Sequence, residues 1–172
     1  MRPIILVLLA AIACAADVRS LPIVNGSMSQ GEATCTGWDQ QWTGSGKLTA
    51  SRDAKVFKEG PASLCLATAG DAKGNISQRI AVPGGSTIAI AGWLRSEGLK
   101  AHVFVQSFDE AWKPIDYKLV LNQFDPAPEW VQFSGTVTVP AKTVQIALGV
   151  AVEGNGKVWI DEVRNVADAK AK

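Results

Sequence analysis

The sequence predicts an all-β protein, folded as a two-sheet antiparallel β-sandwich. Short segments in which apolar and polar residues alternate recur along the chain, and helical spacing of apolar residues is hard to find. Turn-forming residues separate these segments, as in Pro83-Gly84-Gly85 and Gly154-Asn155-Gly156. Roughly ten short strands without intervening helices favour a sandwich or barrel over a fold in which strands and helices alternate.

The candidate strands extend from residue 23 to residue 165. They are Ile23–Gly31, Lys47–Arg52, Ala62–Thr68, Ile76–Val82, Thr87–Arg95, His102–Phe108, Tyr117–Leu121, Trp130–Val139, Val144–Val152 and Lys157–Asn165. The link over residues 96–100 is short, so we expect Thr87–Arg95 and His102–Phe108 to be hairpin partners.

Alternation along these two strands identifies the side that faces the core. Ile88, Ile90 and Leu94 form the apolar set of the first strand, and Val103 and Val105 form that of the second. Full burial of one such side chain stabilises the fold by about 1.5–3 kcal/mol. This gain is large enough to fix the register of each strand.

Length and composition describe one globular domain. The chain has 172 residues, of which 47% are hydrophobic and 19% are charged. We expect a signal peptide over 1–16, a β-sandwich domain over 17–166 and a frayed tail over 167–172. The formal net charge of +1 argues against a nucleic-acid partner, whose binding needs many cations. One His and three Cys are too few for a Cys/His zinc site.

The first sixteen residues have the pattern of a secretory signal peptide. Arg2 precedes an uncharged apolar run, and small residues lead to the first acid, Asp17. The run is shorter than the roughly 20 residues of a membrane span, and no later segment is long and apolar enough to be one. The sequence therefore predicts a secreted or periplasmic protein. A lipoprotein acylated at Cys14 is a minor alternative.

Two cysteines, Cys35 and Cys65, remain after cleavage of the signal peptide. An oxidising compartment favours a disulfide between them. Such a bridge would close a loop of about 30 residues and restrict the unfolded chain by roughly 3–4 kcal/mol. The alternative is two buried free thiols.

Aromatic residues point to a binding surface, since six Trp accompany a single Tyr. If the apolar sets of the central hairpin face inward, the opposite sets share an outer surface. The residues of this surface are Trp93, Arg95, His102, Phe104 and Gln106. The small residues Ala147 and Gly149, if they lie alongside, would leave a shallow trough.

Rings beside amide and guanidinium groups suit a sugar, which presents a C–H face and a rim of hydroxyl groups. Trp112 in a polar loop would close one side, and Trp42 is a similar but weaker candidate. The alternative is that a loop covers Trp93 and Phe104, which would then form a second small core. A lone His such as His102 is more often hydrogen-bonded or solvated than catalytic.

Several stretches occur in the order found in a known family. They are Ile23-Val24-Asn25-Gly26-Ser27-Met28-Ser29, Gly37-Trp38, Glu59-Gly60-Pro61-Ala62-Ser63-Leu64-Cys65-Leu66, Gln78-Arg79-Ile80-Ala81-Val82-Pro83-Gly84-Gly85, Ile88-Ala89-Ile90-Ala91-Gly92-Trp93-Leu94-Arg95, Trp130-Val131-Gln132-Phe133-Ser134-Gly135-Thr136-Val137-Thr138-Val139-Pro140 and Val158-Trp159-Ile160-Asp161-Glu162-Val163. Over roughly residues 22–166 the chain resembles a galactose-binding-like jelly roll of the carbohydrate-binding-module type.

The resemblance implies a jelly-roll fold, a glycan ligand and a structural calcium ion between the first and last strands. Asp161 matches the acidic residue of the closing motif. Ser29 stands where the family has a Glu, and Glu32 follows three residues later. Calcium takes six to eight oxygen ligands, so backbone carbonyls would have to supply most of them.

Two hypotheses about function follow. The first is a secreted, non-catalytic carbohydrate-binding module, because the acids are scattered over turns and no nucleophile elbow or phosphate loop occurs. The second is an envelope structural or protein-interaction β-sandwich without a sugar ligand, which would recognise a protein partner or a second copy of itself.

Overall fold

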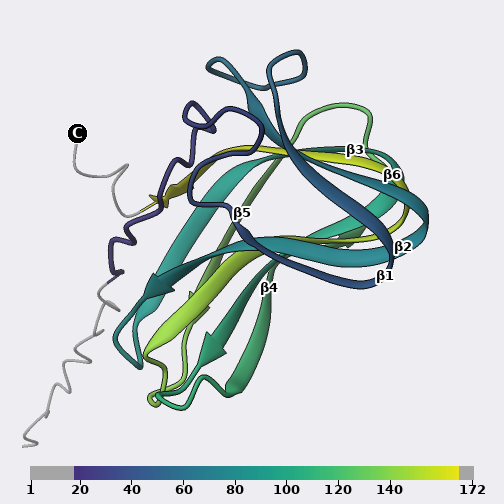
Figure 1. Cartoon of the computed structure of the whole chain (residues 1–172). Coiled ribbons are helices and arrows are strands. Elements are labelled where there is room, and N and C mark those ends of the chain that lie inside the picture. The colour runs from purple at the N-terminus through teal and green to yellow at the C-terminus, as the bar shows by residue number, and fades with distance from the viewer. Residues whose placement is uncertain (1–17, 167–172) are drawn as a thin grey trace, which may run out of the picture.

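The computed structural model describes residues 18–166, apart from the side chains of residues 123 and 124. The signal peptide expected over 1–16 and the frayed tail expected over 167–172 lie outside the described residues. Six strands account for most of the described part (Figure 1). They are β1 (Gln40–Asp53), β2 (Ser63–Ala81), β3 (Thr87–Phe108), β4 (Pro114–Phe124), β5 (Val131–Thr138) and β6 (Gln145–Asn165). In this part of the chain no helix is long and apolar enough to cross a membrane.

Four long strands, β1, β2, β3 and β6, bend and continue from one sheet into the other (Figure 1). Along one of its edges β3 changes partner, because its first half pairs with β5 and its second half pairs with β4. In both sheets the neighbouring strands follow the order β1-β2-β6-β3. Next to β3, the fifth strand is β4 in one sheet and β5 in the other. We call these two layers the β4 sheet (40–45, 72–81, 99–108, 114–124 and 145–154) and the β5 sheet (47–53, 63–69, 87–97, 131–138 and 157–165).

The predicted hairpin between 87–95 and 102–108 is wrong, because residues 96–100 are a bend within one continuous strand. Gly98 has a φ of 75°, and a register shift lies between Glu97 and Leu99. Both of these residues remain paired with β6. A glycine with positive φ kinks a strand as readily as it closes a turn. The two segments are therefore consecutive parts of β3, one in each sheet.

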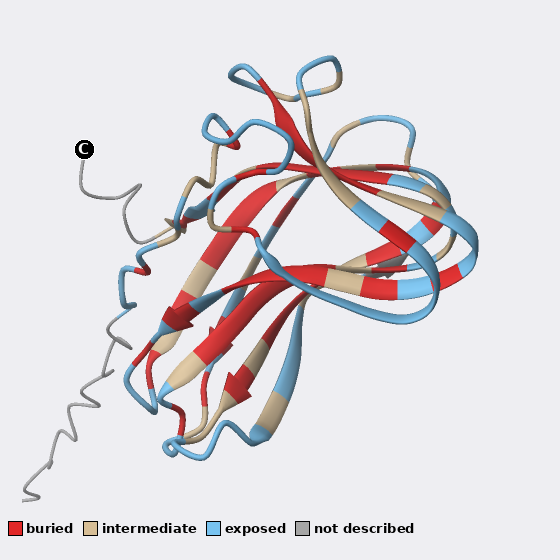
Figure 2. Cartoon of the chain, in the orientation of Figure 1, coloured by how far each residue is buried: buried red, intermediate tan, exposed pale blue. Residues whose placement is uncertain are grey.

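The core lies between the two sheets, and Figure 2 shows burial concentrated along β2, β3 and β6, with β1 largely exposed. Ile88, Ile90, Leu94, Val103 and Val105 are all fully buried. The predicted inward sets of both segments are therefore confirmed. Alternation predicts which residues face the core because side chains point to opposite sides of a pleated strand in turn, and a bend elsewhere in the strand does not change this.

The segment predicted as a first strand, 23–31, forms turns instead. The Asn25 side chain accepts a hydrogen bond from the Gln30 amide and donates to the carbonyl oxygens of Gln30 and Thr36. An Asn side chain that bonds to nearby backbone in this way stabilises a turn. Met28, with a φ of 53°, is carried into the core by this turn.

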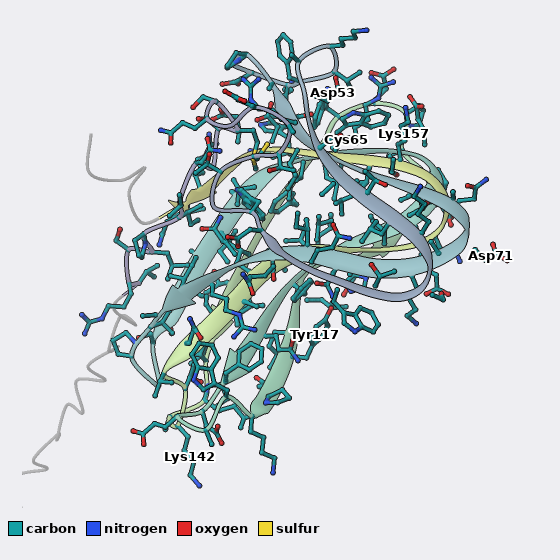
Figure 3. All side chains as sticks on the ribbon, in the orientation of Figure 1. Asp53, Cys65, Asp71, Tyr117, Lys142 and Lys157 are labelled. Carbon is teal, nitrogen blue, oxygen red and sulfur yellow. The ribbon has the colours of Figure 1, made fainter. Side chains whose placement is uncertain are left out.

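The predicted disulfide is not formed, because Cys35 and Cys65 are both free and buried. Cys35 packs in the core, where its Sγ lies 3.8 Å from the Ser63 carbonyl oxygen. Leu64 and Leu66 of β2 also face the core, so Cys65 between them faces the other side of the strand. Figure 3 shows Cys65 near Asp53 and Lys157. Desolvation by burial raises the pKa of both thiols to about 11.

Candidate functional site

A cleft of about 640 Å³ lies on the outer face of the β4 sheet. Its lining comes from strands that are far apart in the sequence, namely β1, β2, β3, β4 and β6. Its volume falls within the range of roughly 300–1,000 Å³ typical of ligand pockets.

The floor of the cleft is formed by small residues in the middle of the sheet. Ala147, Gly149 and Ala151 follow one another on one side of β6, and Gly149 lies between Ser77 of β2 and Phe104 of β3. A Cβ atom at position 149 would lie 2.4 Å from the Ile76 carbonyl oxygen and 2.9 Å from Cζ of Phe104. Glycine is therefore needed at the point where the phenyl ring crosses the floor.

One wall is a group of three rings on β3 and β4. Phe104 and Tyr117 are stacked, with ring centroids 5.1 Å apart and planes at 16°. The Tyr117 hydroxyl lies 2.8 Å from Nε2 of His102, whose ring meets both aromatic rings edge-on. Phe104 is 2% exposed, whereas Tyr117 is 46% exposed. The prediction that Phe104 is the exposed ring is wrong: it supports the ring of Tyr117, which the cleft exposes.

The hydrogen-bonded pair of His102 and Tyr117 is held in the uncharged state. Desolvation by burial lowers the pKa of His102, and nearby Lys73 lowers it further while Glu153 opposes the shift. Desolvation also raises the pKa of Tyr117 to about 12. The pair therefore orients the phenol ring without adding a charge to the wall.

The opposite wall comes from β1, at the other edge of the same sheet. The Trp42 side chain is 54% exposed, and its ring lies over the backbone of Gly44. Gln40 and Gln41 line the cleft beside it. Trp42 and Tyr117 are thus exposed rings on the two edge strands of one cleft, with the small-residue floor between them.

Charged groups lie toward the ends of the cleft. Lys73 and Glu153 form an exposed ion pair at 3.6 Å on adjacent strands. Arg79 lines another part of the cleft, and its guanidinium carbon is 4.8 Å from the centroid of Trp112 and 5.3 Å from that of Phe108.

Trp93 and Arg95 lie on the β5 sheet, outside the cleft. Nζ of Lys58 is 4.2 Å from the centroid of the Trp93 ring. Arg95 bonds to Glu97 at 2.7 Å and lies over the ring of Trp159. Since β3 bends between the two sheets, its early and late residues cannot share one outer surface. The prediction that placed both residues with Phe104 is therefore wrong.

The other predicted residues lie in or beside the cleft. His102, Phe104 and Gln106 line it, and Trp112 contacts Arg79. Sequence reasoning missed Tyr117 and ranked Trp42 below the others. The signal that could have found Tyr117 is the register, because it lies directly beside Gln106 in the sheet.

The expected calcium ligand, Asp161, is fully buried, and its carboxylate binds backbone amides. Oδ2 accepts hydrogen bonds from the amides of Lys58 at 2.8 Å and Glu59 at 3.1 Å, and Oδ1 accepts one from Glu162 at 2.8 Å. Within residues 18–166 no group of three His, Cys, Asp or Glu side chains could hold a metal ion. Three amide hydrogen bonds occupy most of the lone pairs of this carboxylate, so a calcium ion here would depend on other oxygens, such as backbone carbonyls. Calcium binding at Asp161 stays an untested prediction.

No family model matches the sequence, and no curated protein matches it significantly. Solved structures do match. The enzymatically active domain of bacteriophage CBA120 tailspike protein 4 aligns with a TM-score of 0.68 and 15% identity, over 83% of this chain. This chain covers only 21% of that chain, about a fifth of its length.

Two similar structures are carbohydrate-binding modules of nearly the same extent. TmCBM61, solved in complex with β-1,4-galactotriose, has a TM-score of 0.60 and 17% identity, over 86% of this chain and 97% of that chain. The CBM22-1 xylan-binding domain of Paenibacillus barcinonensis Xyn10C has a TM-score of 0.59 and 17% identity, over 82% and 92%. At such low identity these likenesses show the fold. The chain has the β-sandwich jelly-roll fold of the carbohydrate-binding modules.

Proposed function

We propose that this protein is a non-catalytic carbohydrate-binding module and that the cleft of the β4 sheet binds a glycan. The observation that carries the proposal is the pair of exposed rings, Trp42 and Tyr117, on the two sides of a floor of small residues. The C–H face of a pyranose packs on such a ring, while its hydroxyl groups need polar partners at the edge.

The polar partners are present in the same cleft. Gln40, Gln41, Asn75 and Gln106 line it and offer amide donors and acceptors. Gln106 is half-buried and lies between Ala147 and Tyr117 in the register, so its amide stands between the floor and an aromatic wall. A few polar groups on a largely preformed surface are typical of small-molecule sites.

The carboxylates of the cleft support binding rather than hydrolysis. Among the described residues Glu153 is the one carboxylate that lines the cleft, and it is paired with Lys73. Most glycosidases place two carboxyl groups on either side of the scissile bond, about 5–10 Å apart. Two of the similar structures are carbohydrate-binding modules by their own descriptions.

We also propose that the protein acts outside the cytoplasm, because residues 1–16 have the signal-peptide pattern. Expression in a secreting host followed by N-terminal sequencing tests this proposal. A mature chain that begins at Asp17 supports it, whereas an intact chain in the cytoplasm contradicts it.

Glycan binding is tested by affinity electrophoresis and titration calorimetry on soluble galactan, xylan, mannan and β-glucan. We expect Trp42→Ala and Tyr117→Ala each to weaken binding about tenfold, since one stacked ring contributes on the order of 1 kcal/mol beyond area burial. Trp93→Ala is the matched control, because that indole lies on the other sheet. Circular dichroism confirms that all three variants are folded.

Two results would overturn the proposal. One is the absence of binding to every polysaccharide, including acidic ones. The other is equal binding by the wild type and both cleft variants. A protein that binds no polysaccharide but forms a concentration-dependent dimer in which Trp42 fluorescence is protected would favour the interaction domain of the second hypothesis.

A further inference from the structure

We propose that Arg79 forms an anion-binding subsite at one end of the cleft, so that the glycan recognised is acidic and carries a carboxylate or a sulfate group. This inference rests on the proposed function, because it names the chemical class of the ligand of the same cleft.

The Arg79 guanidinium lies against two aromatic rings. Arg79 is paired with Ala147 in the floor, and its guanidinium carbon lies 4.8 Å from the Trp112 centroid and 5.3 Å from the Phe108 centroid. A guanidinium group held against the faces of rings keeps its N–H donors at its edge. The rings therefore fix the orientation of this group and leave its hydrogen-bonding edge free.

Nothing within residues 18–166 takes up these donors. No hydrogen bond or ion pair joins the Arg79 side chain to another described residue, whereas Lys73 is paired with Glu153 at 3.6 Å. Arg95, by contrast, bonds to Glu97. Arg79 is thus a positioned cation that lacks an anionic partner.

The neighbouring loop does not supply that partner. Oδ1 of Asp109 accepts hydrogen bonds from the amides of Ala111 at 3.0 Å and Lys113 at 2.9 Å, so this oxygen is engaged within its own turn. His102, the third basic side chain that lines the cleft beside Arg79 and Lys73, has a lowered pKa because of its burial and stays uncharged at neutral pH. The uncompensated positive charge of the cleft lining therefore lies at Arg79.

The loop holds Trp112 in a strained conformation. Trp112 has a φ of 61° and is 59% exposed, and its amide donates to the Asp109 carbonyl oxygen at 3.0 Å. The left-handed region costs a bulky residue free energy, and such outliers persist where the surroundings enforce them, often at binding sites. Burial does not explain why an indole is held here, whereas alignment of the guanidinium does.

A carboxylate or a sulfate ester on a sugar has the chemistry that fits this group. Either offers two oxygens to the guanidinium edge, and paired charge-assisted hydrogen bonds are among the strongest available to a side chain. If the anionic substituent of one sugar binds Arg79, the next sugars of the glycan would lie over the floor of the cleft, in the direction of Tyr117. The register gives this direction, because Gln106 lies between Ala147 in the floor and Tyr117.

The test compares acidic polymers with matched neutral ones by titration calorimetry. Polygalacturonate is paired with its carboxyl-reduced form, and a sulfated galactan with its desulfated form. We expect each acidic polymer that binds to do so about tenfold more tightly than its neutral match. Arg79→Gln should abolish that difference by lowering the affinity for the acidic polymer to that for its neutral match. Arg79→Lys should keep part of it, because charge remains but the planar fork is lost.

Arg164→Gln is the matched control, since this arginine is exposed on β6 in the other sheet. An equal loss of affinity in this control and in Arg79→Gln would show general charge attraction and overturn the inference. So would equal affinity of the wild type for acidic and neutral polymers, a result that leaves the proposed function intact. Failure of all polymers, acidic and neutral, would overturn both. If the acidic polymer binds more tightly than its neutral match in one of the two pairs alone, that pair shows whether Arg79 binds a carboxylate or a sulfate.

Discussion

Removal of the Asp161 carboxylate should destabilise the protein strongly, even though this residue is outside the cleft. Asp161 is fully buried in the β5 sheet, and Oδ2 accepts the amides of Lys58 and Glu59 at 2.8 and 3.1 Å. These two hydrogen bonds span more than 100 residues of sequence. They attach the loop between β1 and β2 to the last strand.

The expected cost of Asp161→Ala follows from these contacts. A hydrogen bond to a charged group contributes about 1.5–3 kcal/mol. Desolvation by burial raises the pKa of Asp161, which means that the fold already disfavours its charged form, so the lower figure applies. Two such bonds give a loss of about 3 kcal/mol, and the third bond, to the adjacent Glu162, is local and adds little.

Urea denaturation followed by tryptophan fluorescence measures this loss. With an m-value of about 2 kcal/mol per molar, the midpoint should fall by about 1.5 M. Asp161→Asn is the matched variant, because its amide oxygen can still accept both loop amides, and it should lose only about 1 kcal/mol. Both variants and the wild type are measured with calcium and with a chelator.

Two outcomes would refute this reasoning. One is a loss below about 1 kcal/mol for Asp161→Ala, which would mean that the loop amides find water as good a partner. The other is stabilisation of the wild type, but not of the variants, by calcium. That result would make the carboxylate a metal ligand, and the loss in Asp161→Ala would then no longer measure the hydrogen bonds to the loop amides alone.

Three further predictions concern the floor, the rings and the thiols. Gly149→Ala should lower the free energy of unfolding by about 1–3 kcal/mol, because the added methyl group meets backbone and the Phe104 ring; unchanged stability would contradict it. Because the pKa of His102 is lowered on folding, the unfolded chain binds a proton first, so stability should fall as pH drops below about 6.5. A comparison of thermal unfolding of the wild type and His102→Asn checks this slope. Cys35 and Cys65 should not react with a thiol reagent at pH 8 until denaturant is added, because both thiols are buried and their pKa is raised. If the denatured, non-reduced chain also fails to react, the two cysteines form a disulfide and the prediction is wrong.

Much of the fold can be predicted from local alternation, because alternation reports which side of a strand meets the core. In the candidate strand Val144–Val152, the alternate aliphatic residues Ile146, Leu148 and Val150 are fully buried, as such alternation predicts. Val144, which begins the same candidate strand, is exposed, and β6 begins one residue after it. The pattern therefore predicts which side chains of a strand face the core better than it predicts where the strand begins or ends.

The bends could not be predicted in this way. Gly98 in β3 and Gly154 in β6 have the local signature of a chain reversal. Only the pairing between the two strands, as of Leu99 with Gly154, shows that both strands continue. That pairing is a contact between distant parts of the chain. The error carried over to the site, because the assumed reversal brought Trp93 to the surface that holds Phe104.

The role of the Tyr117 ring could not be predicted either, because it too depends on contacts between strands. It belongs to β4, whose side chains are mostly exposed or half-buried and carry a weak pattern. Its importance comes from its neighbours: it stacks on Phe104 and bonds to His102, which lie on another strand. The cysteines show the same limit, because an even count in an oxidising compartment says nothing about which side of a strand each thiol occupies.

The two rings that flank the cleft belong to β1 and β4, the outermost strands of their sheet, whose free backbone edges make them the first places to fray. A rigid oligosaccharide bound to both Trp42 and Tyr117 would connect the two edge strands across the five strand segments of the β4 sheet. Since four of those segments run on into the second sheet, the bound oligosaccharide would slow amide exchange on the far side of the molecule, well beyond any atom it touches, and would raise the melting temperature of the whole domain.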